Sequence, residues 1–402
     1  MTPRSQQLLG FAVRIGVLGT CCLGIWCSLK FAYADYLFKQ ETEQSVRRAT
    51  TVVPDGWEYF MGLADLDEEH AKDLLNTSLN LNHYNAAADI ELGFQYEDEG
   101  DFPRAEKQLL TAYDVDRTYV PRWSLANYYL RRQNMQAFWE WARKAAEMPS
   151  DDLQELFDLC WSASPDASRI TSAILTDNPT LIRQYINFLI TKNQPASVAA
   201  VAPRLIRLGE SEIDRPLLFS AVDMSVTSKD GAAAFDIWRQ MKDQKCIVAD
   251  ATTPNNEAFA RDPLPVRFDW SLPEYAGLHS WPGPAGLESE FTGTEPEDCT
   301  IAEQELVLAP GRYDLSFAYR TSGIAPDTGI RWQVIDEVSG AVLGQSANLS
   351  SEGQVFSGLG FIVPPASSLL RLRLGYHREV GTPRISGKLV VASTDIRPVP
   401  QT

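Results

Sequence analysis

Residues 85–118 read NAAADIELGFQYEDEGDFPRAEKQLLTAYDVDRT, and their small and apolar residues follow helical spacing on both sides of a turn. Gly100, followed by Phe102, marks that turn. Small residues let two antiparallel helices approach each other, and large residues fill the gap between them. The residues that do this are Leu92, Gly93 and Tyr96 on the first helix and Ala105, Leu109 and Ala112 on the second. The stretch therefore predicts a helical hairpin.

The same pattern returns at a spacing of about 34 residues. A shift by that period brings small or turn-compatible residues onto most hairpin positions: Gly93 to Asn127, Gly100 to Asn134, Ala112 to Ala146, and backwards Ala105 to Ala71 and Leu109 to Leu75. Trp139 departs from the pattern, because it stands where the shift expects an alanine. Helical apolar spacing continues to residue 243. We therefore expect about six hairpins over residues 54–243, the last three degenerate, stacked into an α-solenoid.

Residues 85–146 resemble tetratricopeptide repeats, and residues 54–243 resemble such an array with lower fidelity. The resemblance implies a scaffold that binds peptides or protein partners along a concave face. It places four residues of the first helices on that face, namely Phe94, Glu97, Tyr128 and Arg131. The alternative is that these side chains only cover a solvated or inter-repeat surface.

Residues 8–29 form the one strongly apolar stretch of the sequence, and their length suits a bilayer crossing of about 20 residues. We expect an uncleaved membrane anchor over residues 1–30, followed by a helical stalk over residues 31–53. The alternatives are a cleaved signal peptide and a lipoprotein signal at Cys21, which Thr20 directly before it fits poorly. Basic residues lie on both sides of the stretch, so charge alone does not fix the topology.

Helical periodicity stops after Gln244, and Pro, Gly, Ser and Thr become frequent. We expect a linker over residues 244–266 and an antiparallel β-sandwich, a jelly roll, over residues 267–402. Apolar residues alternate with polar ones most clearly at Tyr313, Leu315 and Phe317. The other expected strands cover residues 287–291, 305–308, 330–336, 354–363, 369–376 and 386–392. The predicted class is a multidomain α + β protein with a transmembrane helix, a solenoid and a sandwich.

Residues 306–317, LVLAPGRYDLSF, resemble the core strand pair of carbohydrate-binding, galactose-binding-like sandwiches. The layout of anchor, repeats and sandwich is similar to a family of membrane-anchored repeat proteins encoded with bacterial exopolysaccharide or O-antigen assembly machinery. This resemblance implies a bacterial inner-membrane protein with a single span and a periplasmic soluble part.

Aromatic residues are the candidates for sugar binding, because their rings offer flat apolar platforms. Trp270 and Trp281 lie in loop-like sequence and are the glycan-binding candidates. The alternative for both is that they pack the linker against the repeats. Trp332 and Tyr319 lie on alternating strands, and we expect them in the sandwich core.

The sequence offers no catalytic, metal or cofactor motif. The net charge of −17 argues against nucleic-acid binding. The four histidines form no HExxH motif, there is no GxSxG or phosphate loop, and the cysteines lack CxxC spacing. The disulfide state of Cys160, Cys246 and Cys299 stays open. We therefore expect a non-enzymatic, membrane-tethered scaffold for protein partners in envelope polysaccharide assembly or export. The alternative is a carbohydrate-binding protein that acts through the sandwich.

Overall fold

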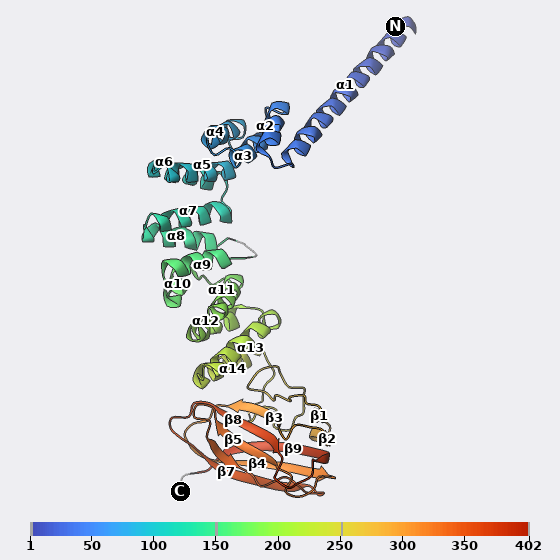
Figure 1. Ribbon diagram of the computed structural model, residues 1–402, viewed down its shortest axis with the longest axis vertical. Coiled ribbons are helices and arrows are strands. Elements are labelled where there is room, and N and C mark those ends of the chain that lie inside the picture. Colours follow the sequence, from blue (N-terminus) through green and yellow to red (C-terminus); the bar gives the residue numbers. More distant parts are fainter. Residues whose placement is uncertain (1–2, 149–151, 251, 401–402) are drawn as a thin grey trace. The chain divides into compact units, whose positions relative to one another are not determined.

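A computed structural model describes residues 3–148, 152–250 and 252–400 (Figure 1). Residues 1–2 of the expected anchor, 149–151 of the solenoid, 251 of the linker and 401–402 of the sandwich lie outside the described residues. The chain divides into two compact units, Met1–Ile174 and Leu175–Thr402. In the described residues, fourteen helices precede an antiparallel two-sheet domain, which confirms the predicted fold class.

The first unit is helical. Its helices are α1 (Pro3–Phe38), α2 (Glu43–Val52), α3 (Trp57–Ala64), α4 (Ala71–Leu81), α5 (Ala86–Asp98), α6 (Phe102–Val115), α7 (Tyr119–Arg131), α8 (Met135–Ala146), α9 (Gln154–Ala163) and α10 (Ala167–Ile174). The second unit begins with α11 (Pro179–Thr191), α12 (Pro195–Leu208), α13 (Ser211–Thr227) and α14 (Gly231–Asp243). From α3 onwards, successive helices pair into the six expected hairpins. The expected solenoid is therefore shared between the two units.

Short polar residues set the starts of α6 and α8, the second helices of two hairpins. The side-chain oxygens of Asp101 and Asn134 accept hydrogen bonds from the backbone N–H groups three residues on, at 3.3 Å in both cases. Such N-caps satisfy donors that have no partner within the helix. The residue before each cap has a positive φ, +78° at Gly100 and +57° at Gln133. The turn of the 85–118 hairpin is therefore repeated after 33 residues rather than 34.

Close approach of α5 and α6 explains the glycine at position 93. A Cβ atom on Gly93 would lie 2.9 Å from Cγ of Leu109. Ala105, Leu109 and Ala112 are all fully buried. The small and large residues of the quoted stretch therefore occupy the helix contact that the sequence predicts for them.

The expected stalk, residues 31–53, is not a free segment in the structure. Helix α1 continues to Phe38, and a four-residue connection leads into α2. Ala34 and Leu37 at the end of α1 pack against Ala49 of α2 and Tyr59 of α3 in one small core. Apolar residues on both helices bury each other here, so the apolar helix and the first hairpin form one folded piece.

The second unit ends in two packed antiparallel sheets. The five-stranded sheet has the order β1-β2-β9-β4-β7, and the four-stranded sheet has the order β3-β8-β5-β6 (Figure 1). The strands are β1 (Leu278–Gly283), β2 (Gly286–Thr292), β3 (Asp298–Leu306), β4 (Gly311–Ser322), β5 (Ile330–Asp336), β6 (Val342–Gln345), β7 (Val355–Val363), β8 (Leu370–His377) and β9 (Ser386–Pro398). Trp332 is fully buried between the sheets and Tyr319 is 7% exposed, as expected for core residues.

The segment expected to be a linker packs onto the sandwich. Phe259 is buried in the sandwich core. The backbone N–H groups of Thr394 and Ile396 in β9 donate to the carbonyls of Glu257 and Thr253, both at 2.9 Å. The side chain of Gln304 in β3 bonds both backbone groups of Asn255, at 2.8 and 3.0 Å. These backbone hydrogen bonds hold residues 253–259 against the sandwich, so the segment is not a flexible connection.

Candidate functional site

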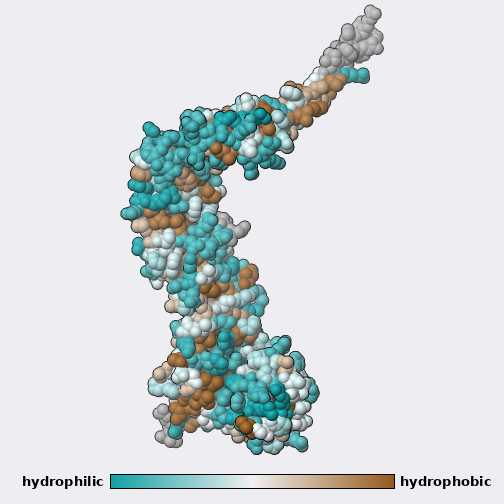
Figure 2. Space-filling view, viewed as in Figure 1, coloured by the Kyte–Doolittle hydropathy of each residue, from teal (hydrophilic) through white to brown (hydrophobic). Residues whose placement is uncertain are grey.

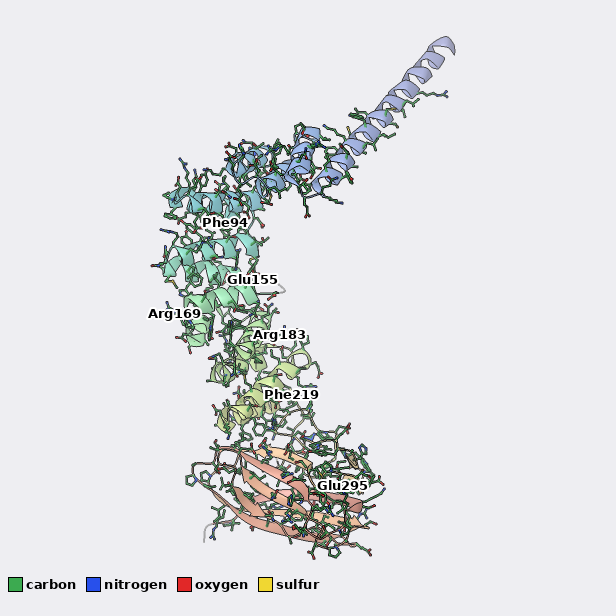
Figure 3. The ribbon with its side chains drawn as sticks, in the orientation of Figure 1. Phe94, Glu155, Arg169, Arg183, Phe219 and Glu295 are labelled. Atoms are coloured by element: carbon green, nitrogen blue, oxygen red, sulfur yellow. The ribbon has the colours of Figure 1, made fainter. Side chains whose placement is uncertain are left out.

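Three of the four predicted hairpin residues form one cluster on α5 and α7. The Arg131 guanidinium makes a two-point contact with the Glu97 carboxylate, Nε to Oε1 at 2.9 Å and Nη2 to Oε2 at 2.5 Å. The same guanidinium lies over the Phe94 ring, 5.5 Å from its centroid. Figure 3 shows Phe94 on α5, in the helical part of the first unit. Glu97 and Arg131 stand 34 residues apart, one more than the 33-residue offset of the turns, and they lie near the C-terminal ends of the first helices of consecutive hairpins.

This cluster, Phe94–Glu97–Arg131, joins two hairpins and keeps an exposed side. The Arg131 side chain is 42% exposed and that of Glu97 is 12% exposed. The hydrogen bonds that Arg131 donates to Glu97 raise the pKa of Arg131, so the guanidinium stays charged. Two-point arginine–carboxylate pairs fix geometry as well as charge. The cluster is an inter-repeat contact that also faces solvent, as in the second alternative given by the sequence, and the binding of a partner there stays a prediction.

Tyr128, the fourth predicted residue, does not lie on an exposed face. It is 3% exposed, and its hydroxyl donates to the carbonyl of Phe102 at 3.0 Å. Its ring also meets that of Tyr129 edge to face, with centroids 5.3 Å apart. Tyr128 is therefore a packing residue between α6 and α7, and the prediction that it binds a partner directly is not supported by its position.

The first two hairpins are strongly acidic. Residues 57–115, which hold these two hairpins, contain fourteen Asp or Glu residues and three Lys or Arg residues, Lys72, Arg104 and Lys107. Burial and the neighbouring Asp65 raise the pKa of Glu91, which shows that some of these carboxylates are close enough to repel. A surface of this sign attracts basic segments and repels acidic ones.

Sequence reasoning missed a set of cation–aromatic contacts between neighbouring helices. Lys72 Nζ of α4 and the Arg104 guanidinium of α6 lie 5.7 and 5.8 Å from the Tyr96 ring centroid. The Arg132 guanidinium lies 3.5 Å from the ring centroid of Phe102. Such contacts contribute about 0.5–1 kcal/mol each at exposed sites. The available signal was the recurrence of an aromatic residue in one repeat with a basic residue in the adjacent helix.

Trp270 is a core residue rather than a sugar platform. It is 2% exposed, and its indole Nε1 donates to the carbonyl of Asn256 at 3.1 Å. Its ring stacks on Phe259, with centroids 4.7 Å apart, and tilts against Trp332 at 6.0 Å. The 252–259 segment folds over it, which corrects the prediction that Trp270 binds a glycan.

Trp281 remains accessible. It lies on β1, half-buried, and its ring stacks on exposed His279 with centroids 5.0 Å apart. In the sheet register, Trp281 stands opposite Glu288 and His279 stands opposite Glu290. Alternate residues of a strand share one face, so these four side chains lie together on one face of the five-stranded sheet. Ligand sites in proteins combine aromatic side chains with a small number of polar groups.

In the part of the chain that the structure describes, no group of three or more His, Cys, Asp or Glu side chains is arranged to hold a metal ion.

No protein-family model and no curated protein matches this sequence. Among solved structures, a CBM4 structure matches with a TM-score of 0.29 and 14% identity, over 37% of this chain and all of that chain. YrrB, a TPR protein with an unusual peptide-binding site, matches with a TM-score of 0.24 and 10% identity, over 51% of this chain and 94% of its own. Pseudomonas aeruginosa pilF matches with a TM-score of 0.25 and 14% identity, over 54% and 90%. Similarity at this level does not carry a function from those proteins to this one.

Proposed function

We propose that the chain is a non-enzymatic scaffold, tethered to a membrane by α1, whose hairpins bind protein partners. The proposal places it in the inner membrane of a bacterium, with its soluble part in the periplasm, in envelope polysaccharide assembly or export. The observation that supports it most is the direct packing of an exposed apolar helix into an acidic hairpin array.

The tether is supported by α1 itself. Among the described residues, one helix is long and apolar enough to cross a membrane, over residues 16–38. Its apolar side chains Leu18, Leu23 and Trp26 are 63–65% exposed. Figure 2 shows this apolar surface along the described part of α1. A helix that is apolar on all sides without a protein partner is suited to lipid.

A signal sequence passes the same test of length and composition. Ala32, Tyr33 and Ala34 have the small-x-small spacing of a signal-peptidase site, which sequence reasoning overlooked. Intact mass measurement of the protein from its membrane fraction decides between the two. The scaffold proposal expects a chain that retains α1, and a chain beginning at Asp35 would remove the tether from the proposal.

Partner binding can be tested at the Phe94–Glu97–Arg131 cluster. A photo-crosslinking amino acid at Phe94, in the full chain in living cells, is expected to give a discrete crosslinked protein. The same group at Val380, which is fully exposed in the sandwich, serves as the control. Because the hairpins are acidic, the captured partner is expected to carry basic segments and to be lost at high salt. Equal crosslinking at both positions would refute the assignment of a binding surface.

The role in polysaccharide assembly has its own test. Deletion of the gene is expected to change the amount or chain length of the surface polysaccharide, and the full-length gene supplied in trans is expected to restore both. An unchanged polysaccharide would remove this role and leave the scaffold proposal to the crosslinking result.

A second candidate function is carbohydrate binding by the sandwich, and accessible Trp281 favours it. The stack of Trp281 on His279 next to two glutamates is the observation that supports it. A glycan array probed with the full chain is expected to show signal that Trp281→Ala removes. Phe356→Ala, on β7 and 80% exposed, is the matched control for loss of an exposed aromatic residue.

A further inference from the structure

Strand β7 is an open edge of the sandwich. It ends the five-stranded sheet and pairs with β4 alone. Its nine residues, 355–363, read VFSGLGFIV and contain no charged residue and no proline. In the described chain, no segment other than β4 makes a hydrogen bond with the backbone of these residues. One side of β7 therefore offers backbone groups with which a further strand can pair.

The three other edge strands of the two sheets are blocked in ways that proteins use to prevent such pairing. Strand β1, at the opposite edge of the same sheet, contains Pro282. Strand β6 has only four residues. The edge of β3 is covered, because Ser271 and Glu303 exchange two backbone hydrogen bonds, at 2.8 and 3.0 Å. Among the described strands, β7 is thus the edge that has none of these protections.

The sequence of β7 is nearly symmetric about Leu359. A two-fold axis at Leu359 would place the same strand of a second copy antiparallel to the first. The opposed pairs would then be Leu359 with Leu359, Val355 with Val363, Phe356 with Ile362, Ser357 with Phe361, and Gly358 with Gly360. Apolar residues therefore meet apolar residues, and glycine meets glycine, at every pair except the one that contains serine.

The exposed side chains of β7 fit the same axis. Phe356 is 80% exposed and Ile362 is 55% exposed, and alternate residues of a strand share one face, so both lie on the same face of the sheet. Ile362 lines a hollow of about 490 Å³, together with Gly360, Arg312 of β4 and Leu343 of β6. The axis would set the Phe356 ring of each copy beside the hollow at Ile362 of the other copy. The strand thus carries a protruding ring and a hollow at positions that the axis exchanges.

These features favour a second copy of this chain over another partner. A two-fold interface needs a surface that is complementary to itself, which the exchanged ring and hollow supply. The chain has a net charge of −17, so two copies repel each other least where both surfaces are uncharged, as at β7.

The expected interface is small. Aromatic side chains such as Phe356 bury about 150–250 Å² each, and specific interfaces bury about 1,200–2,000 Å² in total. Two such rings and two strand edges would lie at or below the lower end of that range. We therefore expect a weak dimer in dilute solution, strengthened when both copies are held in one membrane and their effective concentration rises.

We propose that two copies of this chain pair antiparallel through β7, about a two-fold axis at Leu359, and join their five-stranded sheets into one. The proposal does not depend on the scaffold or on carbohydrate binding. Strands β1 and β7 are opposite edges of the sheet, so the pairing leaves Trp281 uncovered. Trp281→Ala is accordingly expected to leave the dimer intact.

The register can be tested by disulfide crosslinking of the full chain in membranes, with Cys21, Cys22 and Cys27 replaced by alanine. Opposed residues of antiparallel strands have Cα atoms about 4.5–5.5 Å apart, which suits a disulfide. Leu359→Cys is therefore expected to give a crosslinked dimer on mild oxidation. Ser357→Cys is the matched control on the same face of β7, because its counterpart would lie four residues, about 13 Å, away along the strand.

Charge substitutions test the opposed pair of Phe356 and Ile362. Phe356→Glu and Ile362→Lys each set a charge against an apolar residue, and each is expected to weaken self-association about tenfold. The double variant is expected to restore it, because the register sets the two opposite charges against each other. Val380→Lys, at a fully exposed position outside β7, is the control. Analytical ultracentrifugation in detergent measures association, and circular dichroism reports whether each variant is folded.

A crosslink in Leu359→Cys that is absent in Ser357→Cys and lost on adding Ile362→Lys supports the proposal. A chain that stays monomeric in membranes, or crosslinks equally at both positions, overturns it. Crosslinking of Leu359→Cys to a different protein would overturn the choice of a second copy as the occupant. Failure of the double variant to associate, while both single variants are folded, would overturn the register.

Discussion

Asp89 shows how one buried carboxyl affects the stability of the first unit. It lies on α5 and is 2% exposed. Oδ1 accepts a hydrogen bond from Gln108, and Oδ2 has no hydrogen-bond partner. Burial raises the pKa of Asp89 from 3.8 to about 6. Because the folded protein binds this proton more tightly than the unfolded chain, the group costs stability when ionised. The cost is absent below about pH 4, develops between about pH 4 and 6, and is complete at neutral pH.

Asp89→Asn is therefore expected to stabilise the protein at pH 7 by about 2–3 kcal/mol and to change little at pH 4. Asparagine keeps the oxygen that accepts from Gln108. Chemical denaturation at both pH values measures the difference, with Asp73→Asn on the exposed surface of α4 as the control. If the variant is no more stable than the wild type at pH 7, the buried, ionised carboxylate of Asp89 does not destabilise the folded protein.

At the scale of the element, the α5–α6 hairpin depends on a helix contact that leaves no room at position 93. Gly93→Val places a Cβ 2.9 Å from Leu109 Cγ and adds two further carbons. Overpacking of this kind costs about 1–3 kcal/mol. We expect a lower melting temperature for Gly93→Val. Gly100→Asn should change it little, because that turn position is open and asparagine tolerates a positive φ.

Hairpins were predictable from the sequence because local periodicity and small-residue spacing determine them. Turn detail was less predictable. The 34-residue shift aligns Gly100 with Asn134, whereas the structure aligns it with Gln133, and Asn134 caps the next helix. Strand β1 was missed because Pro282 and Gly283 are typical of loops, and β6 because it has only four residues. The short local sequences of β1 and β6 do not distinguish these strands from loops.

In the candidate site, too, the features set by the local repeat pattern were predictable, and those set by contacts with distant residues were not. The stacking of consecutive hairpins brings Phe94, Glu97 and Arg131 together, because the C-terminal ends of α5 and α7 are neighbours. Burial at Tyr128 and Trp270 depends instead on groups far along the chain, the Phe102 carbonyl and the Asn256 carbonyl.

At the scale of the molecule, the joint between α1 and the hairpins decides how the tether acts. Ala34→Glu places a charge in the small core formed by Ala34, Leu37, Ala49 and Tyr59. The end of α1 is expected to detach from α2, so that trypsin cleaves after Lys39 faster in the variant than in the wild type. Ala32→Glu, at an exposed position of the same helix, is the matched control. Equal cleavage rates would mean that this core does not hold the joint closed.

Helix α1 is joined to α2 by only four residues and shares a small core with α2 and α3. This connection leaves no flexible linker about which α1 could rotate independently of the first hairpin. In a bilayer, rotation of α1 about its own axis would therefore rotate the acidic hairpins of the first unit by the same angle. A partner diffusing in the plane of the membrane would then meet those hairpins at one fixed height.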